Sequence, residues 1–420
     1  MNMNTYDKGS SIIRIKTCIR FFQIIIFITL FILIEIALVG RCYSNKKIKV
    51  VDYNPNDISL RITSDEFMDG NSCLTDLRNK SGVTSNAIIR YKGENTVPSM
   101  VVMYLYNGNS FDAPNYSTNA FFYNGEKYGV FEINPNAITG ISIADGIGQN
   151  VESIEFHKNS ILYKYKSIPT DYFGIFVSTF FNCIVFLMLI IIDQKKKFTE
   201  NLITNICLNV KGIIKAGLII LADAVLSFLL FYAIKEVKGY GAFNQYIYIY
   251  ILSILLVIET FIFLRRLISD KPEYVYLCLI LICGLTFIFG SRYGHAGWDV
   301  NMHYDAALNN SYSKNAYYTK TDVYFSTARY ETYVKNSLEE NNSTIKGLND
   351  DYTDLVYCKK ASFDLSRFPA ALAMSFGRTM GMSFDIIFYA MEIINLLIYA
   401  FLTFYAIKIL KSGKYILAML

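Results

Sequence analysis

The stretch FFQIIIFITLFILIEIALV (residues 21–39) decides the fold class of this chain. Almost all of its residues are apolar, and a helix of this length crosses the hydrocarbon core of a bilayer, which is about 30 Å thick. The basic residues that precede it would also suit a signal peptide: Lys8, Arg14, Lys16 and Arg20. The apolar run is longer than the core of a usual signal peptide, and no cleavage site with small residues follows. We therefore expect an uncleaved anchor helix.

Five further apolar segments of similar length follow along the chain. With the first, at about 20–40, they predict six membrane spans, the others being 171–192, 212–234, 246–264, 273–290 and 384–408. The composition agrees, because 53% of the residues are hydrophobic and only 18% are charged, against roughly 25% charged in soluble domains. Residues 197–211 predict a helix at the membrane surface. The last residues, KSGKYILAML, read as the start of another span, so we expect a truncated chain.

Basic residues mark one side of the membrane. They cluster at four places that fall on the same side if the N-terminus is cytoplasmic: before the first span, at 195–197, at 265–271 and at 408–414. The segments that then face outward are 41–170, 235–245 and 291–383. Lys235 and Lys238 in the second segment are a mild exception. Because abundant Lys, Asn and Ile are typical of AT-rich bacterial genomes, we expect a multi-pass protein of the bacterial cytoplasmic membrane.

Residues 47–168, between the first two spans, predict a domain of a different kind. Apolar and polar residues alternate there with the period of two that half-buried strands require. The alternation is clearest in six segments: 58–62, 87–93, 99–106, 128–133, 141–145 and 151–158. Turn-forming pieces such as NGNS and NPNA separate them, and no segment has helical periodicity. These features predict an extracytoplasmic antiparallel β-sandwich.

Residues 291–383 form a second long outward segment, which is polar and rich in Tyr up to about residue 360. A loop of this length seldom serves only as a connection. Its final part, FDLSRFPAALAMSFGRTMGMS, predicts an amphipathic helix on the outer leaflet, with an apolar stripe made of Leu365, Phe368, Leu372 and Phe376.

The predicted organisation of the whole chain has five parts. They are a tail and anchor helix (1–40), a β domain (47–168), four spans (171–290), the outward loop (291–383), and a span followed by the start of another (384–420).

The residues best suited to chemistry lie in GSRYGHAGWDVNMHYDAALNN (290–310), directly after the fifth span. They are Trp298, His295, His303, Asp299 and Asp305. Asp299 is the acid nearer to the span, where it would deprotonate an acceptor hydroxyl or hold a divalent cation against a phosphate leaving group. If residues 301–308 are helical, His303 shares a face with Asp299, and His295 would add a third metal ligand. We expect Asp299 and His303 to act directly and the other three to support them. The plainer alternative is a set of helix-capping acids and solvated imidazoles.

Two arginines are candidates for binding the donor phosphate. Arg292 and Arg378 each offer a planar guanidinium, which binds phosphate oxygens in pairs. Anchoring at the membrane interface would explain either residue equally well. Arg367 lies about three turns before Arg378, and we expect one of these two to face the site.

Acidic residues inside the predicted spans are costly and often functional. They are Glu35, Asp223, Glu259 and Glu392. For each of them, pairing between helices or lining of a cavity is favoured over catalysis. The eight cysteines lack the spacing of a zinc site. Cys42, Cys73 and Cys358 would face outward, and we favour free thiols over a disulfide between two of them.

Several classes of protein are excluded by missing motifs. The chain contains no phosphate-binding loop, nucleophile elbow, HExxH motif or dinucleotide-binding glycine motif after a strand. The net charge of +5 is concentrated at helix ends and follows the topology. We therefore expect no nucleic-acid partner.

The C-terminal part resembles the membrane-protein family DUF2142. WDVNMHYDAA (298–307) is similar to that family's acidic motif with a histidine, although the motif's opening acidic pair is here reduced to Asp299. The more specific match is FPAALAMSFGRTMGMSFDIIFYAMEIINLLIYAFLTFYAIKIL (368–410), in which Glu392 stands where an arginine is expected. The resemblance implies a GT-C glycosyltransferase, a multi-span enzyme that uses polyprenyl-phosphate-linked sugars. It makes Asp299 the motif's acidic residue and His303 the motif's histidine. The β insert is similar to the sandwiches appended to enzymes of bacterial surface polysaccharides.

Three functions remain open from the sequence. The first is a GT-C glycosyltransferase that moves a sugar from a lipid-phosphate donor to a glycan acceptor. The second is a non-enzymatic transport or assembly component for surface polysaccharide. The third is a membrane-anchored sensor, which four further spans and a second outer segment disfavour. The donor sugar, the acceptor and a requirement for a divalent cation stay open.

Overall fold

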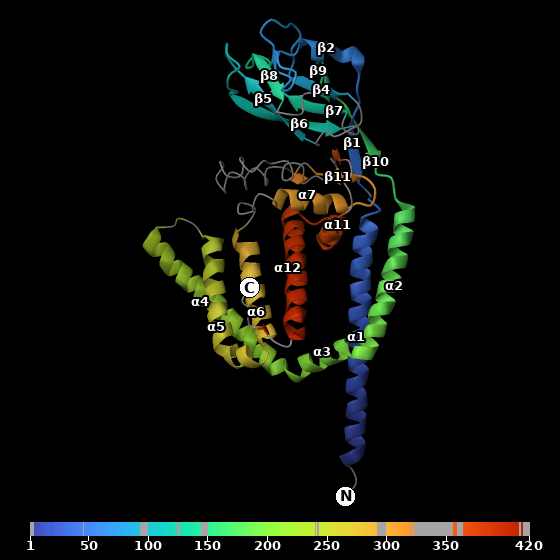
Figure 1. Cartoon of the computed structure of the whole chain (residues 1–420), viewed down its shortest axis with the longest axis vertical. Helices are drawn as coiled ribbons and strands as arrows, with labels where there is room; N and C mark the ends of the chain where they lie inside the picture. The colour runs from blue at the N-terminus through green and yellow to red at the C-terminus, as the bar shows by residue number, and fades with distance from the viewer. Residues whose placement is uncertain are drawn as a thin grey trace. The chain divides into compact units, whose positions relative to one another are not determined.

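The computed structural model describes residues 4–44, 46–92, 100–123, 127–143, 150–239, 241, 243–291, 300–319, 321–322, 356–358, 364–410 and 413–414 (Figure 1). The chain divides into two compact units. The helical unit comprises residues 1–40, 173–296 and 372–420, and the β unit comprises residues 41–172 and 297–371. The segment 297–371 therefore packs in the same unit as the insert between the first two spans.

The helical unit contains the predicted spans. Within the described residues, six helices are long and apolar enough to cross a membrane, with mean hydropathy between 1.9 and 2.8 over their best windows. They are α1 (Asn4–Gly40), α2 (Tyr172–Lys196), α4 (Val210–Lys238), α5 (Gln245–Asp270), α6 (Pro272–Ser291) and α12 (Phe384–Ile409). No more than 22% of each window is buried inside the chain. Most of this apolar surface is thus left exposed, and the prediction of six helices able to span a membrane is confirmed.

Aromatic and small residues lie at the contacts where the helices pack in pairs. The Phe186 ring of α2 packs edge-on against Phe27 and Phe31 of α1, with ring centroids 5.7 and 5.1 Å apart. Figure 1 shows α1 and α2 side by side, in blue and green. The helices α4, α5, α6 and α12 contact one another in that order. At Gly284 of α6, a Cβ atom would collide with the side chain of Leu396, so a small residue allows α12 to approach closely.

Two shorter helices bear on the sequence predictions. The helix predicted at 197–211 is present as α3 (Phe198–Leu208), and it begins after Lys197, whose φ is +51°. The second is α11 (Phe368–Thr379), where the helical stripe predicted from Leu365 onward is wrong at its start. Leu365 lies in a preceding 3₁₀ turn, η5 (Leu365–Arg367), and its side chain is 74% exposed.

The buried face of α11 includes Met374, Ser375 and Arg378. Ser375 Oγ donates to the carbonyl of Ala37 in α1 over 2.6 Å. A Cβ atom on Gly40 would collide with Thr379, so the two helices meet through small and polar groups. The close approach of the two backbones explains why small residues, Gly40 and Ser375, lie at this contact.

The β unit is built on an antiparallel sheet that has eight strands among the described residues, in the order β2-β9-β4-β7-β6-β5-β8-β3. The strands are β2 (Ile58–Thr63), β3 (Thr75–Asp76), β4 (Asn86–Tyr91), β5 (Met100–Tyr106), β6 (Tyr116–Tyr123), β7 (Tyr128–Glu132), β8 (Gly140–Ile143) and β9 (Val151–His157). All six predicted strands are present. Hydrogen bonds join them into a single sheet, whereas a sandwich has two sheets.

One apolar core holds the sheet together. It combines residues from both ends of the strand order, such as Ile62 and Ile154 at one end and Met103 and Ile141 at the other. The two ends are joined where β6 pairs with β7 through only three residue pairs. There, Phe122 lies opposite Gly129, whose missing side chain leaves room for the buried ring.

Two smaller ladders complete the β unit. The first joins β1 (Lys47–Val51) with β10 (Tyr163–Ser167), so that the two ends of the insert meet. The second joins β11 (Ala316–Tyr318) with β12 (Val356–Cys358). Cys42 and Cys73 are buried, and burial raises the pKa of Cys73 to about 12. The side chain of Cys358 lies outside the described residues.

Candidate functional site

The predicted helix around residues 301–308 exists and carries one of the candidate residues. It is α7 (Val300–Asn310), and its buried face is formed by Tyr304, Ala307 and Leu308. This i, i+3, i+4 spacing anchors the helix in the β unit. His303 lies outside that face and is exposed. Four of the sequence candidates lie outside the described residues: Arg292, His295, Trp298 and Asp299.

His303 contacts an arginine that lies 64 residues further along the chain. Its Nε2 atom is 3.2 Å from Nη2 of Arg367. Because a guanidinium only donates hydrogen bonds, Nε2 accepts, and the imidazole is then neutral with its proton on Nδ1. Of the two arginines in the segment 363–383, it is therefore Arg367 that contacts a predicted catalytic residue.

Asp364 holds Arg367 in place. Its Oδ1 atom accepts hydrogen bonds from the backbone N and the Oγ of Ser366, at 2.8 and 2.7 Å, and so caps the turn η5. These hydrogen bonds are the main reason that the pKa of Asp364 lies below its usual value, with a smaller contribution from Arg367. Asp364 Oδ2 lies 3.8 Å from Nε of Arg367. An ionised carboxylate thus fixes the turn from which the guanidinium reaches His303.

Asp305 has a different environment from His303. The Tyr318 hydroxyl donates to Asp305 Oδ1 over 2.7 Å. Burial raises the pKa of Asp305, and this effect outweighs the opposing hydrogen bond from Tyr318. Residues two apart on a helix do not share a face. The structure therefore does not bring Asp305 and His303 together, and Asp305 is linked to strand β11.

A buried polar network that the sequence interpretation missed lies behind α7. Asp322 accepts from the Tyr304 hydroxyl and, over 2.8 Å, from the backbone N of Thr319. Thr319 Oγ1 in turn accepts from the backbone N of Asp322 over 3.1 Å. Thr321 Oγ1 is buried and has no hydrogen-bond partner among the described residues. The signal in the sequence is TKTD (319–322), which has the spacing of a capping box.

Arg378 belongs to the helical unit. Its side chain is buried, and Nη2 donates to the carbonyl of Gly40, the last residue of α1, over 3.3 Å. A cation at the C-terminal end of a helix is stabilised by the helix dipole and by the free carbonyls there. This contact gives Arg378 a structural role at the end of α1.

A second polar cluster lies on the β unit, on the face of the sheet opposite the apolar core. Glu155 of β9 is completely buried and accepts from the hydroxyl of Tyr53 over 2.7 Å and from that of Ser153 over 3.0 Å. The ring of Tyr53 stacks on Tyr128 with centroids 4.7 Å apart, and the Arg90 guanidinium lies 5.8 Å from its centroid. Aromatic rings beside charged groups are common in small-molecule sites. No signal in the sequence marked Glu155 as buried.

Three of the four acids inside the predicted spans have polar partners on a neighbouring helix, as the sequence favoured. Glu35 of α1 accepts hydrogen bonds from Thr179 and Asn182 of α2, the latter over 2.8 Å. Asp223 of α4 and Glu259 of α5 interact electrostatically across two helices that contact each other. Asp223 Oδ2 has no further partner in the described part of the chain.

Within the described residues, no group of three or more His, Cys, Asp or Glu side chains is placed to hold a metal ion. No protein-family model, curated protein or solved structure matches the chain. The resemblance to DUF2142 therefore stays a hypothesis that rests on the residue patterns alone.

Proposed function

We propose that this chain is a membrane glycosyltransferase of the GT-C type, which takes a sugar from a polyprenyl-phosphate donor and adds it to a cell-surface glycan. The observation that carries the proposal is the contact between His303 and Arg367. It joins two groups able to bind phosphate oxygens, and α7 begins at Val300, directly after Asp299 in the sequence. The proposed location is the bacterial cytoplasmic membrane, with the N-terminus in the cytoplasm and the β unit outside.

In the proposed reaction, Asp299 is the general base. Its carboxylate takes the proton of the acceptor hydroxyl as the oxygen bonds to the anomeric carbon of the sugar. The bond between that carbon and the phosphate oxygen breaks, and polyprenyl phosphate leaves with the electron pair. Arg367 and His303 stabilise the charge that develops on the leaving phosphate. Arg292 is a further candidate for this phosphate.

The β unit is proposed to bind the glycan acceptor. The support is the stacked pair of Tyr53 and Tyr128, beside which the guanidinium groups of Arg61 and Arg90 supply hydrogen-bond donors. Arg61 donates to the Tyr53 hydroxyl over 3.1 Å, which holds the ring in position. Tyrosine combines an apolar ring with a polar hydroxyl, and this suits the mixed surface of a sugar.

The test is sugar transfer in membranes that contain the full chain and a labelled polyprenyl-phosphate sugar. We expect Asp299→Asn to reduce the rate by at least about a hundredfold and Arg367→Gln to reduce it by about a hundredfold. The control is Arg78→Gln, which makes the same chemical change on a side chain that pairs with Asp76 in the β unit. Wild-type transfer by a folded Asp299→Asn protein would remove the assignment.

A non-enzymatic role in polysaccharide transport is the second candidate. The interaction between Asp223 and Glu259 in the adjacent helices α4 and α5 favours it, because neighbouring acids inside membrane spans suit a proton-coupled path. In that case Asp223→Asn would abolish glycan export while Asp299→Asn left it intact. If the chain is instead a glycosyltransferase, Asp299→Asn would abolish its activity while Asp223→Asn left it intact.

A further inference from the structure

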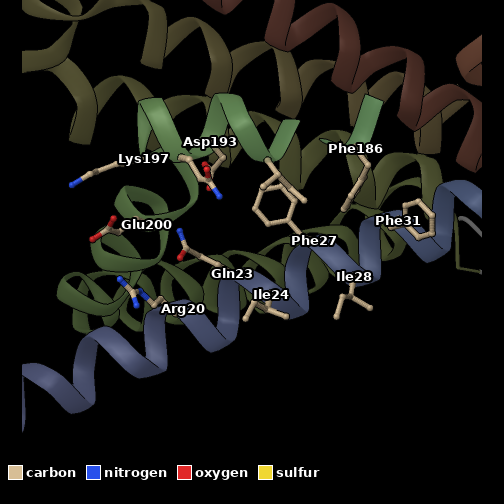
Figure 2. Close-up of a pocket in the computed structure, with 12 residues that line it drawn as sticks. Arg20, Gln23, Ile24, Phe27, Ile28, Phe31, Phe186, Asp193, Lys197 and Glu200 are labelled. Carbon is tan, nitrogen blue, oxygen red and sulfur yellow. The ribbon is translucent and has the colours of Figure 1, made fainter. Parts of the chain in front are cut away.

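The helical unit contains a cavity of about 530 Å³ between α1, α2 and α3. Figure 2 shows side chains from α1 and from the end of α2 on either side of it. Its lining residues on α2 lie at 186–194, near the end of that helix, and those on α1 lie at 20–31, in the middle of that helix. None of the described residues that line the cavity belongs to the proposed catalytic site.

The inner part of the cavity is apolar. Phe27 and Phe31 of α1 pack edge-on against Phe186 of α2 and form its floor. Ile24 and Ile28 continue the apolar wall, and they are 57% and 53% exposed. Such a wall suits a hydrocarbon chain, because apolar side chains within a bilayer pack against acyl chains through van der Waals contacts.

The mouth of the cavity is polar and is fixed by hydrogen bonds between three helices. Gln23 Nε2 of α1 donates to Thr199 Oγ1 of α3 over 2.8 Å. Thr199 Oγ1 donates to Asp193 Oδ2 of α2 over 2.5 Å, and the Thr199 backbone N donates to Asp193 Oδ1 over 2.8 Å. The Asp193 carboxylate is thus used within the protein, and the mouth is preformed.

The charge left at the mouth is positive. Arg20 and Lys197 line it, and neither forms an ion pair in the part of the chain that the structure describes. Glu200 is the remaining acid there, against these two cations. Lys197 is held as the residue before α3 with a left-handed backbone (φ +51°), so its position is set by the turn between the helices. A ligand with one negative charge would complement this mouth.

The length of the cavity fits one leaflet of a membrane. Arg20 at the mouth and Phe31 at the inner end lie eleven residues apart on α1, which corresponds to about 16 Å along the helix. Half of the hydrocarbon core of a bilayer is about 15 Å thick. A charged group at the mouth would therefore lie at the membrane surface while its chain followed α1 to the middle of the bilayer.

We propose that this cavity binds one phospholipid with a net negative headgroup, with the phosphate between Arg20 and Lys197 and an acyl chain along Phe27, Phe31 and Phe186. The lipid would join α1 to α2 and α3, which otherwise meet at the mouth through Gln23 and Asp193. The proposal does not depend on glycosyl transfer, because lipid retention is measured with no sugar donor present.

The experiment uses the purified full chain in phosphatidylcholine vesicles that contain a trace of photoactivatable phosphatidylglycerol. We expect the lipid to cross-link to α1 and α2, and unlabelled phosphatidylglycerol to compete far better than added phosphatidylcholine. Each cation near the membrane surface should strengthen binding of the anionic lipid about fivefold. The variant Arg20→Gln/Lys197→Gln, which removes both cations, should therefore reduce the cross-link on the order of twentyfold. The matched control, Lys211→Gln/Lys215→Gln, removes the same charge from α4 outside the cavity.

Four results would overturn the proposal. Equal competition by phosphatidylcholine on the wild-type chain would remove the preference for negative charge, and this arm needs no variant to fold. An equal loss of cross-linking in the α4 control would show a general surface effect. Displacement of the lipid by soluble glycerol phosphate, or an unchanged cross-link in Ile28→Trp, would remove the role of the acyl chain.

Discussion

The carboxylate of Glu155 lies 2.9 Å from the guanidinium of Arg61, and the two ends of this ion pair have opposite environments. The Glu155 side chain is completely buried, whereas that of Arg61 is 42% exposed. Burial raises the pKa of Glu155, but the His157 imidazole, the hydroxyls of Tyr53 and Ser153 and the charge of Arg61 together lower it below its usual value. The charged form of Glu155 therefore stabilises the folded β unit.

We predict that Glu155→Gln destabilises the protein by about 2 kcal/mol at neutral pH, the usual contribution of hydrogen bonds to a charged group. A lowered pKa stabilises the folded state above the unfolded value of about 4.5, and the stabilisation is lost as the pH falls through the folded value. The difference in melting temperature between the variant and the wild type should thus shrink below about pH 4.5. Thermal melts of the detergent-solubilised chain, followed by circular dichroism, measure it.

The control for this prediction is Glu152→Gln in the same strand. Glu152 pairs with Arg90 over 3.2 Å, but its side chain is 42% exposed. An exposed ion pair contributes little, so the variant should change stability by less than about 0.5 kcal/mol. Equal effects of the two substitutions would show that burial of Glu155 is not what matters.

Local sequence patterns predict the membrane spans and many of the strands. The spans are marked by composition alone, and strands such as Ile58–Thr63 are marked by alternation. Strand β6 was missed because its first half, YSTN, is polar and hides the buried side chains of Ala120 and Phe122. The strands β1 and β10 were also missed, although they alternate Lys with apolar or aromatic residues; among the described residues they pair with each other and not with the eight-stranded sheet.

The candidate sites depend on contacts that no local pattern contains. The helix that carries His303 was predictable, but its contact with Arg367 joins residues 64 positions apart. Because Glu155 alternates with core residues along its strand, the sequence pattern predicts an outward-facing, solvated acid. It is buried because the chain around Tyr53 covers that face of the sheet, and this follows only from tertiary packing.

We predict that Gly129→Ala destabilises the β unit by about 1–3 kcal/mol, the range for overpacked cores. The new Cβ atom would lie 2.6 Å from the buried Phe122 ring. Phe122→Leu should reduce this cost in the double variant, which a double-mutant cycle of melting temperatures measures. Gly70→Ala is the control, because a Cβ atom there meets nothing within 4 Å. Additive effects at 122 and 129 would argue against the contact.

We predict that Asn182→Ala weakens the pairing of α1 and α2. It removes the 2.8 Å hydrogen bond to Glu35 and leaves the carboxyl group with the Thr179 hydroxyl. Hydrogen bonds between membrane helices contribute about 0.6 kcal/mol on average, and up to about 1.7 kcal/mol. The aggregation temperature of the solubilised chain should fall, while Cys183→Ala, the neighbouring position with an exposed side chain, should leave it unchanged. Similar values for both variants would contradict the role given to Glu35.

We predict that Asp305→Asn stabilises the protein at pH 7.5 by about 1 kcal/mol, because the amide avoids the cost of burying a charge and still accepts from Tyr318. The folded pKa of Asp305 is raised from its ordinary value of 3.8. The protonated form of Asp305 therefore contributes its full stabilisation of the folded state at pH values below 3.8. This stabilisation is lost as the pH rises through the pKa of Asp305 in the folded protein. The two proteins should melt at the same temperature below about pH 4, and their melting temperatures should differ above it.

Tyr318→Phe, which removes the donor to the carboxylate, should lower the melting temperature at pH 7.5. A lower melting temperature for Asp305→Asn at that pH would instead reveal a partner that favours the charged form.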